Sequence, residues 1–117
     1  MLKTIPLIEA CCSPVLEGTL AEGEAEQLAS AFAVLADPAR LRLVSLIAAQ
    51  PDGEACVCNL TEPVGLSQPT VSHHLRVLHE AGILEREPRG RWVFYRVVPE
   101  RLSILADALA QPAVVAG

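Results

Sequence analysis

The segment between Gly65 and Gly82 constrains the fold of this chain more than any other part of the sequence. Ser67 is a residue type that caps helix N-termini, and Gly82 suits the left-handed position that follows a helix. Three apolar residues recur at helical spacing between them: Val71, Leu75 and Leu78. We therefore predict an amphipathic helix over residues 68–80, with one face packed in a core and the other face polar.

Three helices are predicted before this one. Residues 21–36 carry apolar side chains at helical spacing after a glutamate-rich first turn, where negative charge is favourable. Asp37 followed by Pro38 is typical of a helix start, and that second helix is expected to run to about Ala49. A short third helix is expected near residues 55–63. Only a few residues separate it from the next helix, which is the spacing of a helix-turn-helix.

After residue 82 the hydrophobic period changes from that of a helix to that of a strand. Residues 83–87 and 92–98 are expected to be strands, joined by the turn Pro88-Arg89-Gly90-Arg91. A last helix is predicted over residues 100–110. The order α-α-α-α-β-β-α is that of a winged helix-turn-helix, a mainly α fold with a small β-hairpin. An aromatic content of 3% also favours helices over a β-sandwich.

The net charge of −5 argues on its own against a nucleic-acid ligand, but the charges are unevenly distributed. Residues 1–65 contain three basic and nine acidic residues, whereas residues 66–101 contain six arginines, four glutamates and all three histidines. A mildly basic half is compatible with DNA binding, because the local field at the contact surface matters more than the total charge. Ordinary surface charge explains the same pattern, so this observation alone does not decide.

The polar face of the 68–80 helix carries side chains that suit a DNA major groove. Glutamine binds adenine with two hydrogen bonds, serine and threonine bind bases or phosphates, and the free N–H groups of a first helical turn suit a phosphate. Arginines at the hairpin turn can bind backbone phosphates or enter a minor groove. The predicted DNA-binding residues are Ser67, Gln68, Thr70, Ser72, His73, Arg76, Arg89 and Arg91. His74 lies closer to the packed side and is interpreted as structural.

The length of 117 residues suits one compact domain. We expect residues 1–20 to be an irregular segment with a cysteine pair, residues 21–110 to form the DNA-binding and dimerisation domain, and residues 111–117 to be a tail. One helix covers too few base pairs for a regulator, so a homodimer is expected. The first and last helices have apolar faces that suit its interface, or alternatively close the monomer core. No apolar run suits a membrane span or a signal peptide, so we expect a cytoplasmic protein.

Four cysteines form the other candidate site: Cys11, Cys12, Cys56 and Cys58. A disulfide is not expected, because the cytoplasm is reducing and one intervening residue is poor geometry for a local bridge. At the start of the predicted 55–63 helix, partial positive charge lowers the thiol pKa and favours thiolates. Thiolates select soft ions such as As(III), Cd(II), Cu(I) or Zn(II), and spacing alone decides neither the ion nor the ligand set. Two alternatives remain. Cys56 and Cys58, the later pair, are small buried apolar residues, and Cys11 and Cys12 are an accidental pair of exposed thiols.

Several stretches of the sequence resemble the ArsR/SmtB family of winged-helix repressors. They are residues 35–42 (LADPARLR), 54–60 (EACVCNL), 66–75 (LSQPTVSHHL) and 78–84 (LHEAGIL), and the resemblance extends over roughly residues 25–105. It implies a homodimeric repressor that leaves its operator DNA when a metal or metalloid binds. Cys56-Val57-Cys58 resembles the arsenic-sensing branch of this family.

The resemblance also bears on which cysteines bind the ligand. The enterobacterial form of that branch has a further cysteine where this chain has Thr61. Other members, notably actinobacterial ones, combine an N-terminal Cys-Cys pair with a third-helix cysteine of the partner subunit. The implied site is therefore Cys11 and Cys12 with Cys56 or Cys58, crossing between protomers, with As(III) as the inducer and Sb(III) as a second candidate. Residues 100–117 contain no histidine, which disfavours the zinc-sensor type.

Two other functions remain as alternatives. A sensor of Cd(II), Pb(II) or Zn(II), or a thiol-redox-switched repressor, requires the same fold with a different input. A thiol enzyme is disfavoured, because the sequence has neither a glycine-rich anion loop after a strand nor a Cys-x5-Arg motif. We expect no catalytic residues and no catalytic cofactor.

Overall fold

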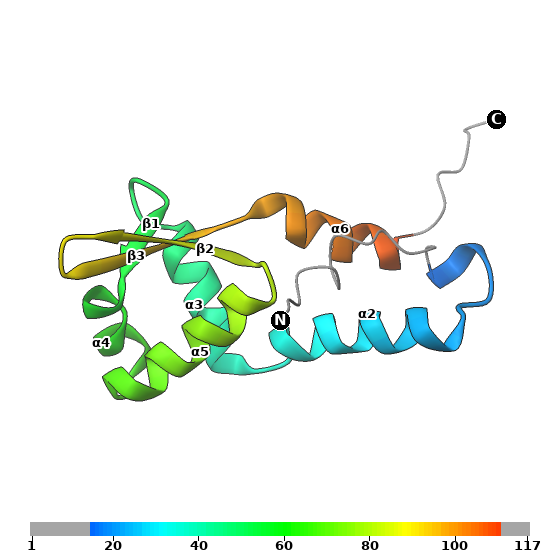
Figure 1. Ribbon diagram of the computed structural model, residues 1–117, viewed down its shortest axis with the longest axis horizontal. Helices are drawn as coiled ribbons and strands as arrows, with labels where there is room; N and C mark the ends of the chain where they lie inside the picture. The colour runs from blue at the N-terminus through cyan, green and yellow to red at the C-terminus, as the bar shows by residue number, and fades with distance from the viewer. Residues whose placement is uncertain (1–14, 111–117) are drawn as a thin grey trace.

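The computed structural model describes residues 15–110, and its elements follow the winged helix-turn-helix order (Figure 1). The helices are α2 (Glu22–Leu35), α3 (Pro38–Ala48), α4 (Thr61–Val64), α5 (Gln68–Glu80) and α6 (Pro99–Leu109). The strands are β1 (Glu54–Cys56), β2 (Leu84–Arg89) and β3 (Trp92–Val97). Two 3-10 turns, η1 (Val15–Glu17) and η2 (Val57–Asn59), complete the described secondary structure.

Both ends of α5 have the predicted caps. The Ser67 hydroxyl oxygen accepts a backbone N–H of the first turn at 3.4 Å. At the other end Gly82 has a φ of +86°, and its N–H bonds to the carbonyl of His79. The N–H of Ile83 bonds to the carbonyl of Leu78, which completes a Schellman motif. The predicted helix over residues 68–80 is confirmed.

The core lies between α3, α5 and one face of the sheet. Val71, Leu75 and Leu78 of α5 are fully buried, as their spacing predicts. Leu43 and Ile47 of α3 are also fully buried, and α3 and α5 are in contact. Each such side chain contributes about 1.5–3 kcal/mol to folding through burial alone. This packing holds one face of α5 in the core and leaves its opposite face at the surface.

The prediction of a single short helix over residues 55–63 is wrong. Residues 54–56 form β1, which pairs antiparallel with β3 and makes it the central strand of the order β1-β3-β2. Without β1, the outer edge of β3 would expose unpaired backbone N–H and C=O groups. Ala55 lies opposite Tyr95, and both side chains are buried. The α-helical part is limited to the four residues of α4, which follow the 3-10 turn η2 and precede Gly65 in the left-handed conformation.

The remaining helices and strands agree with the predicted elements to within a few residues. Asp37 caps α3 by accepting the N–H groups of Ala39 and Arg40, at 2.8 and 3.2 Å. The segment predicted to be irregular contains the 3-10 turn η1. Residues 1–14 of that segment and the predicted tail, residues 111–117, lie outside the described residues.

The two ends of the molecule are built from different elements (Figure 1). At one end α2 and α6 run side by side, and η1 contacts α6. At the other end the β2–β3 hairpin extends as the wing beside α4 and α5. Among the helices in the described part of the chain, none has the length and hydropathy needed to cross a membrane.

Replacement of Leu43 by alanine tests the packing between α3 and α5. We expect L43A to lower the free energy of unfolding by about 2–5 kcal/mol, because it opens a cavity in a close-packed core. The matched control is L41A, two residues earlier on the same helix, where the side chain is 53% exposed. Its expected effect is below about 1 kcal/mol. Equal losses for the two variants in urea unfolding would contradict this description of the core.

Candidate nucleic-acid interface and cysteine site

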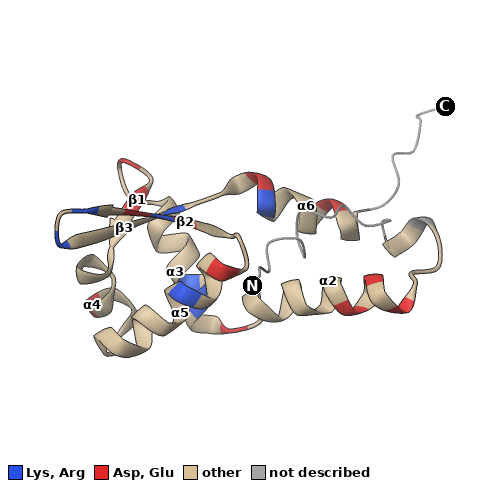
Figure 2. Cartoon of the chain, in the orientation of Figure 1, with Lys and Arg blue, Asp and Glu red and all other residues tan. Residues whose placement is uncertain are grey.

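The predicted DNA-binding residues of α5 lie on its surface face. The side chains of Gln68, Thr70, His73 and Arg76 are exposed, as is Ser67 at the cap, and Ser72 is half-buried. The same helix buries its apolar row, so this polar face is held in a fixed orientation by the core. Figure 2 shows basic residues interspersed with acidic ones on the helices and hairpin of this part of the molecule, whereas the charged residues of α2 are all acidic.

The first turn of α5 offers a weaker anion site than the sequence predicts. Pro69 occupies the second helical position and has no N–H. The N–H of Thr70 is bonded to the Ser67 hydroxyl, which in turn donates to the Thr70 hydroxyl at 3.0 Å. Gln68 is left with the remaining first-turn N–H. The prediction of free N–H groups in this turn is therefore corrected, because Pro69 has no N–H and that of Thr70 is bonded to the cap.

The two arginines of the hairpin turn differ in their surroundings. Arg91 is exposed at the turn, with its guanidinium 5.7 Å from the centre of the Trp92 ring. Arg89 forms a two-pronged ion pair with Glu54, at 2.6 and 2.9 Å. It also binds Glu87 at 2.8 Å and lies 4.5 Å from the Phe94 ring centre. In the DNA-free chain the Arg89 guanidinium is therefore held by carboxylates, and a contact of Arg89 with DNA stays a prediction.

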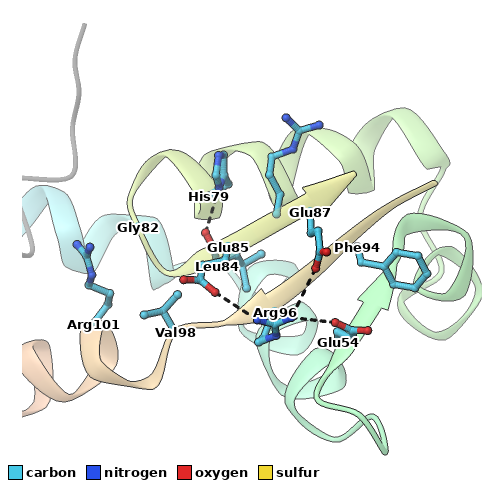
Figure 3. A pocket seen from close by; sticks show the side chains of 11 residues that line it. Glu54, His79, Gly82, Leu84, Glu85, Glu87, Phe94, Arg96, Val98 and Arg101 are labelled. Carbon is cyan, nitrogen blue, oxygen red and sulfur yellow. Dashed lines mark hydrogen bonds and ion pairs between the residues drawn. The ribbon is translucent and has the colours of Figure 1, made fainter. Parts of the chain in front are cut away.

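These ion pairs shift the titration of the groups that form them. Hydrogen bonds from Arg89 and Arg96 lower the pKa of the Glu54 carboxyl to about 2. Hydrogen bonds to Glu54 and Glu87 raise the pKa of the Arg89 guanidinium. The Arg89 hydrogen bond also lowers the pKa of Glu87. Figure 3 shows Arg96 at the centre of this cluster, with Glu54, Glu85 and Glu87 around it.

Arg86 is a candidate DNA contact that the sequence reasoning missed. It lines a cavity of about 330 Å³ together with Ser72 and Arg76 of α5, and Glu80 and Tyr95 also border it. Two arginines from different elements thus border one hollow between α5, the recognition helix of the helix-turn-helix, and the wing, which suits a DNA phosphate. The available signal was the strand period: Arg86 is two residues after buried Leu84, so both point to the same side of β2.

His74 has the structural role that its position on the helix predicts. Its Nδ1 accepts a hydrogen bond from the Arg40 guanidinium at 3.1 Å. The same guanidinium donates through Nε to the carbonyl of Val34, at 2.6 Å. Arg40 therefore joins the C-terminal turn of α2 to the recognition helix.

The later cysteine pair is a disulfide, which corrects the expectation that no bridge forms there. Cys56 and Cys58 are covalently linked, with their Cα atoms 5.4 Å apart. The bend from β1 into the 3-10 turn η2 brings the two sulfur atoms to the same side, which a continuous helix would not do. The predicted position at a helix start is also wrong, because Cys56 ends β1 and Cys58 lies in η2. Cys56 is buried and Cys58 is exposed.

The other predicted metal ligands, Cys11 and Cys12, lie outside the described residues. Within residues 15–110, no group of three or more His, Cys, Asp or Glu side chains is placed to hold a metal ion. When reduced, Cys56 and Cys58 supply two sulfur atoms, which is fewer than a group of three ligands.

A recognition helix with a polar outer face, a preceding short helix and a wing define a winged helix-turn-helix protein of the DNA-binding class. Residues 37–86 match the family described as bacterial regulatory protein, arsR family. Over 69 residues the chain is 52% identical to an arsenic resistance transcriptional regulator of Pseudomonas putida, covering 59% of this chain and 52% of that protein. Over 79 residues it is 33% identical to the arsenical resistance operon repressor of Bacillus subtilis, covering 67% and 73%.

Solved structures agree with this assignment. The antimony-specific transcriptional repressor AntR is similar with a TM-score of 0.64 and 33% identity, over 80% of this chain and 86% of that one. A homodimeric winged helix-turn-helix domain of Mycobacterium bovis, a possible ArsR-family regulator, has a TM-score of 0.60 and 25% identity, over 76% and 83%.

The chain belongs to the ArsR family of bacterial regulatory proteins, and the resemblance seen in its sequence is confirmed. These relatives are named as regulators and repressors, so the family is one of regulators and not of enzymes. The match spans about half the length of the Pseudomonas putida regulator.

The pKa of Glu54 gives a pH test of the wing ion pairs. The folded-state pKa of about 2 lies below the ordinary value of 4.5, so the charged carboxylate stabilises the fold. This contribution is complete above pH 4.5 and is lost as the pH falls through about 2. We expect wild-type protein to melt at a higher temperature than E54Q near neutral pH, with the difference disappearing in strong acid. A difference between their melting temperatures that stays constant with pH would contradict the assignment.

The salt dependence of DNA binding tests the cavity between α5 and the wing. We expect R76Q and R86Q each to weaken binding to all sequences and to reduce the salt slope by about 1, because each removes one phosphate contact. R101Q, on α6 and outside this cavity, is the charge-matched control; once gel filtration shows that it has the same oligomeric state as the wild type, it should keep the wild-type slope. An unchanged slope for both R76Q and R86Q would exclude this cavity as a phosphate site.

Proposed function

We propose that this protein is a metalloid-responsive transcriptional repressor that binds operator DNA as a homodimer and is released by As(III). Sb(III) is a second candidate inducer. The observation that carries the proposal is the placement of Cys56 and Cys58, whose Cα atoms lie 5.4 Å apart directly before the helix-turn-helix. Two cysteines with Cα atoms this close can bind one soft ion through both sulfur atoms when they are reduced.

The DNA-binding half of the proposal rests on the polar face of α5 and on the wing. In a dimer, two copies of α5 enter successive major grooves, and the wings flank them. The dimer interface is expected on α2 and α6, the two helices that lie apart from the wing (Figure 1). Leu16 and Leu109 support this surface, since both are 55% exposed and belong to η1 and α6, which contact each other.

The ligand half requires the reduced form of the later cysteines. As(III) binds thiolates, so the Cys56–Cys58 disulfide must first be opened by a reductant, as the cytoplasm provides. The third thiolate is expected from Cys11 or Cys12, with the site crossing between protomers. The Pseudomonas putida and Bacillus subtilis relatives are named for arsenic or arsenical resistance, and AntR is an antimony-specific repressor, which supports an arsenical or antimonial inducer for this chain.

Ligand binding and DNA binding are coupled through direct contact in this proposal. The turn η2, which holds Cys58, contacts α5. A metalloid that draws the sulfur atoms toward a third ligand therefore moves the segment against which the recognition helix rests. A coupling of about 1–3 kcal/mol, typical of allosteric proteins, changes DNA affinity by roughly 5- to 150-fold.

The disulfide favours one second candidate function, a repressor switched by thiol oxidation. With hydrogen peroxide as oxidant, the Cys56 and Cys58 thiols lose two electrons and two protons and one S–S bond forms. The O–O bond of the peroxide breaks, and its two oxygen atoms leave as two waters. The reduced and oxidised forms then differ in the same segment that contacts α5. Here the input is an oxidant instead of a metalloid, and the output is again operator affinity.

Arsenite titration of the DNA complex tests the proposed function. We expect arsenite to weaken operator binding by reduced wild-type protein at least several-fold in a gel-shift assay, because the coupling above opposes DNA binding. C56S/C58S should bind DNA as the wild type does and ignore arsenite, and C11S/C12S should respond weakly. Cd(II), Pb(II), Zn(II) and peroxide are compared in parallel. Unchanged operator affinity of wild-type protein at saturating arsenite would exclude the metalloid function.

A further inference from the structure

One face of the three-stranded sheet joins the cysteine pair to the wing. Side chains two residues apart on a strand share a face, so Glu54 and Cys56 of β1 point to the same side. Directly opposite them on β3 are Arg96 and Phe94. Facing these on β2 are Glu85 and Glu87, and Arg89 is opposite Trp92 at the end of the hairpin. This outer face is therefore a continuous row of interacting side chains from the cysteine strand to the wing.

Glu54 is the group through which β1 binds the outer part of the wing. Its carboxylate receives both terminal nitrogens of Arg89, at 2.6 and 2.9 Å, and one of Arg96, at 3.1 Å. The Glu54 side chain is only 16% exposed, whereas those of Glu85 and Glu87 are 64% and 57% exposed. A forked arginine pair that is partly shielded from water is stronger and more directional than an ordinary surface pair.

A second contact, between Arg89 and Phe94, also connects the wing to β1. The Arg89 guanidinium lies 4.5 Å from the centre of the Phe94 ring, and Phe94 pairs with Cys56 in the sheet register. Cys56 is thus linked to Arg89 in two ways, through Glu54 along its own strand and through Phe94 across the sheet. Arg89 occupies the last position of β2, next to the exposed turn residues Gly90 and Arg91.

We propose that Glu54 is a positioning residue that transmits the chemical state of the Cys56–Cys58 pair to the wing. This inference rests on the proposed function in that the wing is taken to contact DNA. When the disulfide is opened, or the thiols are oxidised or bind a ligand, β1 shifts against β3. The two hydrogen bonds between Arg89 and the Glu54 carboxylate then determine whether Arg89 and the hairpin turn keep their position. The cysteine pair then acts on DNA binding by two routes, η2 to α5 and β1 to the wing.

Trp92 provides a direct readout of the wing. It is the chain's one tryptophan, lies at the hairpin end on this same face and is 50% exposed. In a Cys11→Ser, Cys12→Ser background, Cys56 and Cys58 are the only cysteines left to change state between dithiothreitol and hydrogen peroxide. We expect the Trp92 emission of the DNA-free protein to differ between these two forms.

The decisive variant is E54Q, with E85Q as its matched control. Both remove one carboxylate that binds Arg96, but of these two glutamates Glu54 alone is bonded to Arg89. We expect E54Q to lose the Trp92 difference between reduced and oxidised protein, to bind operator DNA roughly two- to thirty-fold more weakly when reduced, and to keep its two titratable thiols. E85Q should behave as the parent protein in all three measurements.

A double-mutant cycle separates positioning from a general structural role. If Glu54 acts through Arg89, E54Q has little further effect on Trp92 emission in an R89Q background. R89Q breaks the same fork from the wing side, so it also decides the question if E54Q is found unfolded by circular dichroism. The proposal is overturned if Trp92 emission is the same in both forms of the parent, or if E54Q or R89Q keeps the full difference.

An arsenite arm distinguishes this inference from the proposed function. If sodium arsenite fails to release DNA from reduced wild-type protein, the metalloid function fails, while the thiol–disulfide comparison still decides the role of Glu54. If arsenite releases DNA equally from wild-type protein and E54Q, with no change in Trp92 emission, the metalloid function stands and the role of Glu54 is rejected.

Discussion

The burial of one face of α5 is the interaction on which the rest of this structure depends. Val71, Leu75 and Leu78 are fully buried, and the helix is closed at its ends by Ser67 and Gly82. Because the helix cannot rotate without exposing that apolar row, its polar side chains are presented in one fixed direction. The wing starts directly after this helix, so its position follows from the same packing.

The sheet adds a second constraint, since it places the cysteine segment and the wing in one hydrogen-bonded unit. β3 pairs with β1 on one side and with β2 on the other. The carboxylate of Glu54 then lies within reach of Arg89, 35 residues later in the chain. The proposed cysteine site and the proposed DNA surface of the wing are thereby connected by backbone pairing and by ion pairs.

The sequence was sufficient where a local pattern has one physical solution. Asp37-Pro38 predicted a helix start, the apolar spacing predicted the buried face of α5, and residue 82 predicted its end; all are confirmed. The exposure of Gln68 and Arg76 followed from the same helical period. Conversely, the strand at residues 54–56 was missed, because three residues are too few for a period and the strand exists only by pairing with a distant partner.

Local chemistry therefore determined the four longer helices, the caps of α3 and α5, the hairpin and the polar surface of α5, because each depends on neighbours within a few positions along the chain. Only the tertiary structure decided that Cys56 and Cys58 lie in a bend where they bridge, that Arg89 binds carboxylates, and that Arg86 borders a cavity with Arg76. Each of these depends on which segments meet across the sheet, and long-range pairing leaves no periodic signal in the sequence.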